Sequence, residues 1–272
     1  MKKHLPIVLI ILASFLTAGC ANMTSAGKPS TIIHRIQQRG TVIVGTAADM
    51  PPLNMMTKNG LPAGLDVDLA QAIAGAMGVE LKLEIKNFAD LLPALYAGEI
   101  DMVISGMTIT PDRNLKVAFA GPYHITGKSY LTKIAVIAKI TDPNELNSEK
   151  FHFTALAGST SERLVKELMP QAKYTQVNRY EDGVALVLND KVDAMVSDYH
   201  ACIMATVRNP NAGLVTIFSR FTYEPLGIAL PAGDAHLLNW MENFIGIAAD
   251  SGMLDELKLK WIKDTSWITE LP

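Results

Sequence analysis

Hydrophobic and polar positions follow two alternating periods in the first half of the chain. Short β-branched or alternating runs predict strands at 41–46, 81–85 and 101–105. Between them, apolar residues four apart predict a helix over 65–77, and a second helix is predicted over 88–97; each is closed by a following glycine. Because strands and helices alternate, we expect right-handed crossovers and a mostly parallel sheet.

A second, smaller α/β unit follows. Residues 129–140 are strand-like and long enough to pass from one unit to the other. The predicted strands of the second unit are 151–156, 192–197 and 215–218, and its predicted helices begin at Ser159 and cover 184–188 and 200–207. The chain then returns through a strand at 224–230 to a long helix over 235–251.

Composition narrows the function classes. The 272 residues suffice for two modest domains, and the net charge of −3 with scattered Lys and Arg argues against a nucleic-acid partner. His124, His152 and His200 lack the spacing of a metal site. Since there is also no glycine-rich phosphate loop and no Ser-His-Asp pattern, we expect no cofactor, no metal and no covalent catalysis.

The amino terminus has the pattern of a targeting segment. Lys2 and Lys3 precede an apolar stretch that is too short to span a membrane, which predicts a signal peptide over 1–19. The residues before Cys20 resemble a lipoprotein processing site, although Thr17 replaces the usual Leu, and 20–31 is a polar tether. A plain secretory signal with an incidental Cys20 is the alternative. Cys202 is expected to pack as a small hydrophobe, without a disulfide.

The stretch 101–131 organises the candidate chemistry. Its strand ends before Gly106, and Thr110-Pro111-Asp112 has the pattern of a helix start. Arg113 therefore follows the carboxyl end of a strand, which is where open α/β sheets bind ligands. A bound anion would explain a cation at that place. A solvated surface arginine is the alternative.

The chain resembles bacterial extracellular solute-binding proteins of the polar amino-acid type, the receptors of ABC importers. The resemblance spans nearly all of 41–262 and is carried by DMVISGMTITPDR, VAFAGPYHITG, GLDVDLAQAIAGAMG, GSTSE, DAMVSDY and EPLGIALPAGD. It implies a two-lobed, periplasmic-binding-protein-like (type II) α/β fold with a two-strand hinge, crossing near 129–135 and 220–227. Lobe 1 would comprise 32–130 and 225–272, and lobe 2 would comprise 131–224.

The resemblance also implies a function and its partners. The protein would capture an amino acid or a similar small carboxylate and deliver it to an ABC importer permease. It would be a monomer in the periplasm or on the outer face of the cell membrane, attached through lipid at Cys20.

The same resemblance places a ligand site. The ligand carboxylate would be held by the backbone of Gly106, by Thr108 and Arg113, and by Thr160 with Ser159 beside it. Asp198 would accept the α-ammonium group. Thr108 is alternatively a strand-end hydroxyl bonded to its own backbone, and Ser159, Thr160 and Asp198 are alternatively helix caps, a role expected of at least one of the first two.

The side-chain end of the ligand is less defined. Phe88 matches an apolar or aromatic wall, although a core role at a helix start is the alternative. Met50 stands where many members of the family have an aromatic, and Ala47 stands where several have an acid. The sequence therefore does not name the ligand.

A second function class is enzymatic. Periplasmic cyclohexadienyl (arogenate/prephenate) dehydratases share the fold, and they carry a glutamate as general acid three residues after the strand-end aspartate. That position is Ala201 here, which has no proton to donate. The sequence therefore favours a receptor over an enzyme.

Overall fold

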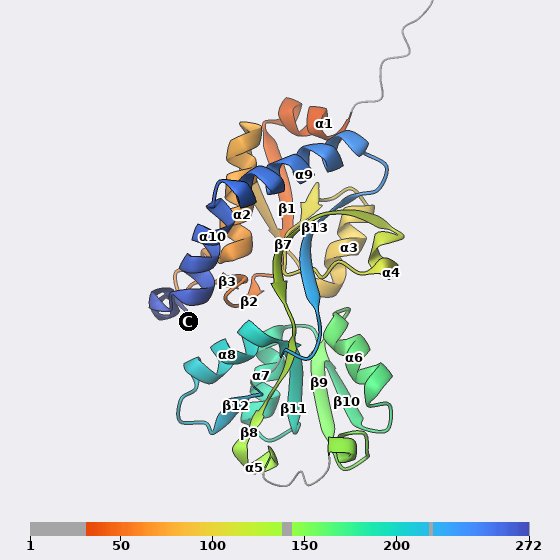
Figure 1. The fold of residues 1–272 in the computed structure, drawn as a ribbon, viewed down its shortest axis with the longest axis vertical. Coiled ribbons are helices and arrows are strands. Elements are labelled where there is room, and N and C mark those ends of the chain that lie inside the picture. Colours follow the sequence, from red (N-terminus) through yellow and green to blue (C-terminus); the bar gives the residue numbers. More distant parts are fainter. Residues whose placement is uncertain (1–30, 138–142, 218–219, 272) are drawn as a thin grey trace, which may run out of the picture. The chain divides into compact units, whose positions relative to one another are not determined.

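The computed structural model describes residues 31–137, 143–217 and 220–271. The predicted signal peptide and Cys20 lie outside these residues. The elements before the first crossing between the two large sheets are α1 (Ile32–Arg39), β1 (Thr41–Thr46), β2 (Asp49–Met50), β3 (Asn54–Met56), β4 (Pro62–Ala63), α2 (Leu65–Met77), β5 (Glu80–Ile85), α3 (Phe88–Tyr96), β6 (Met102–Val103), α4 (Pro111–Asn114) and β7 (Val117–Thr126) (Figure 1).

The chain then builds a second sheet and returns. The elements that follow β7 are β8 (Lys128–Lys133), α5 (Ile134–Ile137), η1 (Pro143–Leu146), β9 (His152–Leu156), α6 (Thr160–Leu168), β10 (Lys173–Val177), α7 (Tyr180–Leu188), β11 (Ala194–Asp198), α8 (Tyr199–Arg208) and β12 (Leu214–Thr216). The last elements are β13 (Glu224–Pro231), α9 (Ala235–Asp250), α10 (Met253–Lys258), η2 (Leu259–Lys263) and η3 (Ser266–Glu270).

Two five-stranded sheets confirm the α/β class, and we call the elements around each sheet a lobe. The first lobe has the strand order β5-β1-β6-β13-β7, and the second has β10-β9-β11-β8-β12. Three strands of each sheet are parallel, but β13 and β7 in the first, and β8 and β12 in the second, are antiparallel to their neighbours. The sheets are therefore mixed rather than mostly parallel.

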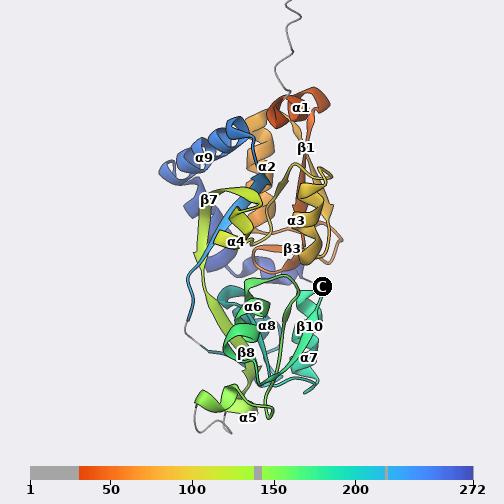
Figure 2. The same cartoon turned by 90° about the vertical axis from the view of Figure 1, so that its right-hand side faces the viewer.

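The chain passes between the sheets twice. It leaves the first sheet at Thr126 and enters the second at Lys128, and it returns between Thr216 and Glu224. Figure 2 shows β7 continuing into β8. The segment predicted to be strand-like over 129–140 is a strand only to Lys133, after which α5 begins.

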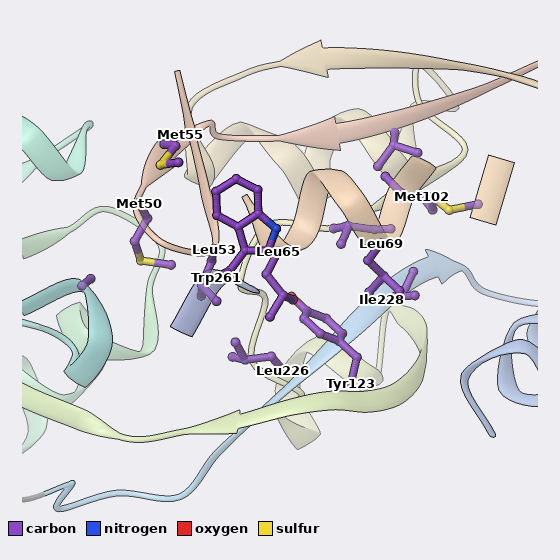
Figure 3. Packing of buried hydrophobic residues seen from close by; sticks show 14 of the residues in the cluster. Met50, Leu53, Met55, Leu65, Leu69, Met102, Tyr123, Leu226, Ile228 and Trp261 are labelled. Carbon is purple, nitrogen blue, oxygen red and sulfur yellow. The ribbon is translucent and has the colours of Figure 1, made fainter. Parts of the chain in front are cut away.

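Both faces of the first sheet are buried, because neighbouring residues of its central strands belong to two different apolar clusters. Met102 and Ile228 pack with α2 and α9, whereas their neighbours Val103 and Ala229 pack with α3 on the other face. Successive strand residues point to opposite faces, so an unbroken apolar run suits a strand covered on both sides. Figure 3 shows part of the apolar cluster that contains Met102 and Ile228, to which Met50 also belongs.

Local sequence signals set most element ends. Helix α2 ends at Gly78, α4 begins after Thr110, and α6 begins after Ser159, as predicted. Strand β6 is shorter than the predicted 101–105. The Asp101 carboxylate accepts a hydrogen bond from the Ile43 N–H at 2.8 Å, so a side chain replaces a strand partner there.

Asp66 stands in the first turn of α2, where an acid complements the helix dipole, and it is also fully enclosed. Its carboxylate accepts hydrogen bonds from the Tyr123 hydroxyl at 2.7 Å and from the Asn54 amide at 2.8 Å. Burial raises the pKa of Asp66 to about 6 in spite of these two donors. Asp66 thereby ties α2 to β7 and to β3, the strand that begins at Asn54.

The segment around Pro51 and Pro52 contains three short strands. Strands β2, β3 and β4 form a small antiparallel sheet around the turn at Pro51 and Pro52. Cys202 is buried, as expected of a small hydrophobe. Within the described part of the chain, no helix is both long and apolar enough to cross a membrane.

Gly64→Ala should destabilise the fold, whereas Gly75→Ala should stabilise it. Gly64 has φ +128°, and a Cβ there would lie 2.3 Å from the Leu53 carbonyl oxygen, so we expect a loss of at least ~1–3 kcal/mol. Gly75 lies inside α2 with nothing within 4 Å of an added Cβ, so alanine should gain ~0.5–1 kcal/mol. Urea denaturation of both variants measures the difference, and equal effects would contradict this packing.

Candidate functional site

All eight predicted ligand-binding residues line one cavity. It lies where the chain leaves β6 and β11 and where α6 begins. The predicted residues there are Met50, Phe88, Gly106, Thr108, Arg113, Ser159, Thr160 and Asp198, and Lys128, Leu156, Ser161 and Ser197 complete the wall. Residues from both lobes therefore meet at one place.

Arg113 is held by backbone carbonyls of both lobes. Its Nη1 donates to the Thr108 carbonyl at 2.8 Å and its Nη2 to the Gly158 carbonyl at 2.9 Å, while the guanidinium lies 5.6 Å from the centre of the Phe88 ring. Burial lowers the pKa of Arg113 to about 10, so it stays charged at neutral pH. Among the described residues, no carboxylate lies within ion-pair distance of it.

Thr108 and Thr160 donate to the same carboxylate oxygen. The Thr108 hydroxyl lies 2.8 Å from Oε2 of Glu224, and the Thr160 hydroxyl lies 2.9 Å from it. Both hydroxyls therefore point to the Glu224 carboxylate rather than to their own backbone. The alternative of local bonding for Thr108 is wrong, and Thr160 is the first residue of α6 rather than its cap.

Lys128 lies between two acids. Its Nζ is 3.0 Å from Oδ2 of Asp198 and 3.6 Å from Oε2 of Glu224, and its side chain is 2% exposed. The ion pair with Asp198 follows from strand register, because the two residues stand directly opposite each other on β8 and β11. A buried charge needs such partners.

The pKa values of Glu224 and Asp198 are shifted in opposite directions. Burial alone would raise the pKa of Glu224, but Lys128 and the hydroxyl donors lower it below its usual value. Burial raises the pKa of Asp198 and Lys128 opposes the rise. Oδ1 of Asp198 is buried and has no hydrogen-bond partner in the described part of the chain, so this oxygen can still accept a donor.

Ser159 is the helix cap. Its hydroxyl accepts from the Glu162 N–H at 3.1 Å and donates to the Leu156 carbonyl at 2.6 Å. The Glu162 carboxylate accepts a hydrogen bond from the N–H of Gly158 rather than from that of Ser159. Asp198 occupies the cap position of α8 but makes no side-chain cap bond to described residues, since Oδ2 is taken by Lys128. The expectation that Ser159 or Thr160 caps a helix is confirmed.

Met50, Phe88 and Leu156 form the apolar part of the wall. Gly106 has φ +57°, and a Cβ there would lie 2.7 Å from the Met50 methyl group, so only glycine suits this position. Ala47 lines a neighbouring open hollow of about 830 Å³ instead of the cavity. Phe88 is both a pocket wall and a member of the core beside α3.

The cavity is nearly full. Its volume is about 20 Å³, room for roughly one water molecule, whereas ligand pockets usually measure ~300–1,000 Å³. An outer hollow of about 390 Å³ shares Arg113, Ser159 and Thr160 with it. A ligand of amino-acid size therefore requires movement of the side chains that now fill the site.

Lys128 and Glu224 are the site residues that sequence reasoning missed. The available signal was a charged residue at the first position of each strand that follows a crossing, in the runs KSYLTK and EPLGIALP. Strand-end charges are common at solvent-exposed places, so the pattern alone does not reveal burial.

Asp49 makes a further contact between the lobes. Its Oδ2 accepts from the N–H of Tyr180, the first residue of α7, at 2.9 Å, and Asp49 itself is 7% exposed. Burial raises its pKa to about 6, although the bond from Tyr180 and the charge of Arg179 lower it; Glu181 and Asp182 also raise it. Closure of the lobes over Asp49 therefore favours its protonated form.

Two α/β lobes joined by two crossings, with ionic and hydroxyl groups of both lobes around one cavity, define a two-lobed ligand-binding protein. Residues 42–264 match the model of the bacterial extracellular solute-binding proteins, family 3, and the chain belongs to this family.

Relatives and solved structures agree with this assignment. The glutamine-binding protein GlnH of a Bacillus subtilis ABC transporter is 28% identical, over 97% of this chain and 98% of its own length. An ancestral amino acid-binding protein, a precursor of cyclohexadienyl dehydratase, is 36% identical with a TM-score of 0.77, covering 84% of this chain and 98% of that one. An arginine-bound ABC-transporter binding protein from Streptococcus pneumoniae is 26% identical with a TM-score of 0.78, covering 85% and 97%.

Asp49→Asn should stabilise the protein at neutral pH and not at pH 4. The folded-state pKa of about 6 exceeds the usual 3.8, so the cost of burying the ionised carboxyl is absent below pH 3.8 and complete above pH 6. Asparagine removes that cost, up to roughly 3 kcal/mol, and its carbonyl can still accept from Tyr180. Denaturation at pH 4 to 8 measures the difference from wild type. Asp250→Asn, exposed at the end of α9, is the control, and a pH-independent difference for Asp49→Asn would refute the assignment.

Proposed function

We propose that this protein is an extracytoplasmic receptor that captures an amino acid or a similar small carboxylate between its lobes and delivers it to an ABC importer permease. Two of the relatives named above are a glutamine-binding protein and an arginine-bound binding protein of ABC transporters. The observation that carries the proposal is the partly buried Arg113 guanidinium, which is bonded only to backbone carbonyls in the described part of the chain and lies beside two converging hydroxyls.

The residues have distinct roles in this proposal. The ligand carboxylate takes the fork of Arg113 and the hydroxyls of Thr108 and Thr160, whereas the backbone N–H of Gly106, which the resemblance assigned to the ligand, already lies at the buried Asp66 carboxylate and lowers its pKa. Asp198 offers its open oxygen to a donor on the neighbouring carbon. Ser159 keeps the first turn of α6 in place, and Phe88 and Met50 contact the ligand side chain.

Ligand capture involves motion about the hinge. The two lobes, each built around one of the five-stranded sheets, separate to admit the ligand and close on it as a monomer, since a ligand bound by both lobes favours the closed state by its differential affinity. The bonds of Arg113 to Gly158 and of Thr160 to Glu224 break when the lobes separate.

The proposal includes a place in the cell. The segment 1–19 is removed as a signal peptide, and Cys20 is lipidated, so the receptor remains attached in the periplasm or on the outer face of the cell membrane. The pattern around Cys20 and the extracellular character of the family support this place.

Arg113→Ala should weaken ligand binding by roughly 10- to 100-fold, because a charge-assisted contact worth ~1.5–3 kcal/mol is lost. A thermal-shift screen of the purified full chain against amino acids and small carboxylates first finds ligands, since binding to the folded state raises the melting temperature. Calorimetry then compares wild type, Arg113→Ala and the control Arg35→Ala, which lies exposed on α1. Unchanged affinity in Arg113→Ala would show that the carboxylate site lies elsewhere.

The protein should not dehydrate prephenate or arogenate. One structural relative is an ancestral precursor of a dehydratase, but Ala201 is a buried alanine on α8 and donates no proton. The neighbouring His200 is not a substitute acid, because burial lowers its pKa to about 4 and its ring packs against that of His124. Loss of a general acid commonly costs ~10²–10⁴-fold. Product formation well above the uncatalysed rate would favour the enzyme instead.

A further inference from the structure

The chain itself occupies both polar ends of the proposed ligand site. The Glu224 carboxylate bonds to the hydroxyls of Thr108 and Thr160, where the ligand carboxylate would bind. The Lys128 ammonium bonds to Asp198, where a ligand ammonium would bind. An internal carboxylate and an internal ammonium thus stand in for the two charged groups of an amino acid.

A ligand carboxylate has to replace Glu224. Each threonine hydroxyl has one proton to donate, and both protons now go to Oε2 of Glu224. The remaining volume of about 20 Å³ admits no second carboxylate. Glu224 is the first residue of β13 and follows Tyr223, which is 69% exposed, so the surface lies one residue away along the chain.

Lys128 is placed differently and stays in the site. It faces Asp198 across the strand pair β8–β11, its side chain is 2% exposed, and its backbone N–H bonds to the Thr222 hydroxyl at 2.9 Å. Its Nζ lies 3.6 Å from the oxygen of Glu224 that a ligand oxygen would replace. Lys128 is therefore within reach of the ligand carboxylate while it neutralises Asp198.

The charge balance of the site then determines which group the ligand carries on the carbon next to its carboxylate. With Glu224 displaced, Arg113 and Lys128 are balanced by Asp198 and the ligand carboxylate. An α-ammonium group would add a third cation to an enclosed site, which is costly. The open Oδ1 of Asp198 still calls for a donor, and a neutral hydroxyl meets that need without a charge.

The geometry points to a site that prefers 2-hydroxy carboxylates with an apolar side chain over the matching α-amino acids, with Lys128 as the residue that determines this preference. The apolar side chain is indicated by Met50, Phe88 and Leu156. This inference rests on the proposed receptor function and narrows its ligand class.

Matched ligand pairs test it. Calorimetry on the purified full chain compares L-2-hydroxyisocaproate with L-leucine, and L-phenyllactate with L-phenylalanine. We expect the hydroxy acid of each pair to bind at least ~10-fold more tightly, the effect of one charged contact. Equal or tighter binding of the amino acids overturns the inference and leaves the receptor function standing. If no hydroxy acid, amino acid or other small carboxylate binds, both fail.

Two variants test the role of each internal group. Lys128→Met should reverse the order within each pair, because a ligand ammonium then becomes the partner of Asp198. Glu224→Gln should tighten hydroxy-acid binding, since a neutral amide competes less well for the hydroxyls. Lys116→Met, exposed before β7, is the matched control and should change neither order nor affinity. An unchanged order in a folded Lys128→Met protein overturns the role of Lys128, and if that variant does not fold, the wild-type order decides.

Discussion

The cost of removing charged side chains from water is the constraint on which the centre of this structure depends. Lys128, Asp198 and Glu224 are buried together, and Arg113 closes one side of the same cavity. An unpaired buried charge costs several kcal/mol, whereas a paired and hydrogen-bonded charge costs much less. Two of the stabilising bonds, from Arg113 to Gly158 and from Thr160 to Glu224, join elements of different lobes. The charges are therefore fully compensated only when the lobes are in contact.

The hinge supplies half of these charges. Lys128 follows the first crossing and Glu224 ends the second, so neither belongs to the loops that form the rest of the site. The two crossing segments are tightly packed, since a Cβ on Gly127 would lie 2.5 Å from the Thr222 carbonyl oxygen. A change of backbone geometry at the hinge thus also moves the groups that fill the cavity, which couples lobe motion to occupancy of the site.

Sequence patterns predicted what depends on neighbouring residues and missed what depends on register. Caps, glycine stops and apolar periods located α2, α4 and α6, and strand order gave the α/β class. The antiparallel strands and the pairing of Lys128 with Asp198 were not accessible, because the two residues lie 70 positions apart and only the register of β8 on β11 brings them together. The burial of Asp66 was not accessible for the same reason, since its partner Tyr123 comes from a distant strand.

Membership of a family establishes the fold of this chain, but the ligand depends on the particular groups in the cavity. The site residues that the family resemblance assigned do converge on one cavity. However, Glu224 already accepts hydrogen bonds from Thr108 and Thr160, and Lys128 already pairs with Asp198. A ligand can shift the lobes toward closure only by the amount that it binds the closed state better than the open one. In the closed state the Glu224 carboxylate already serves the two hydroxyl groups as their acceptor. A ligand carboxylate that replaces it therefore stabilises the closed state only by the difference between its own binding free energy and that of Glu224. The internal groups thereby set both the affinity and the chemical class that the site can accept.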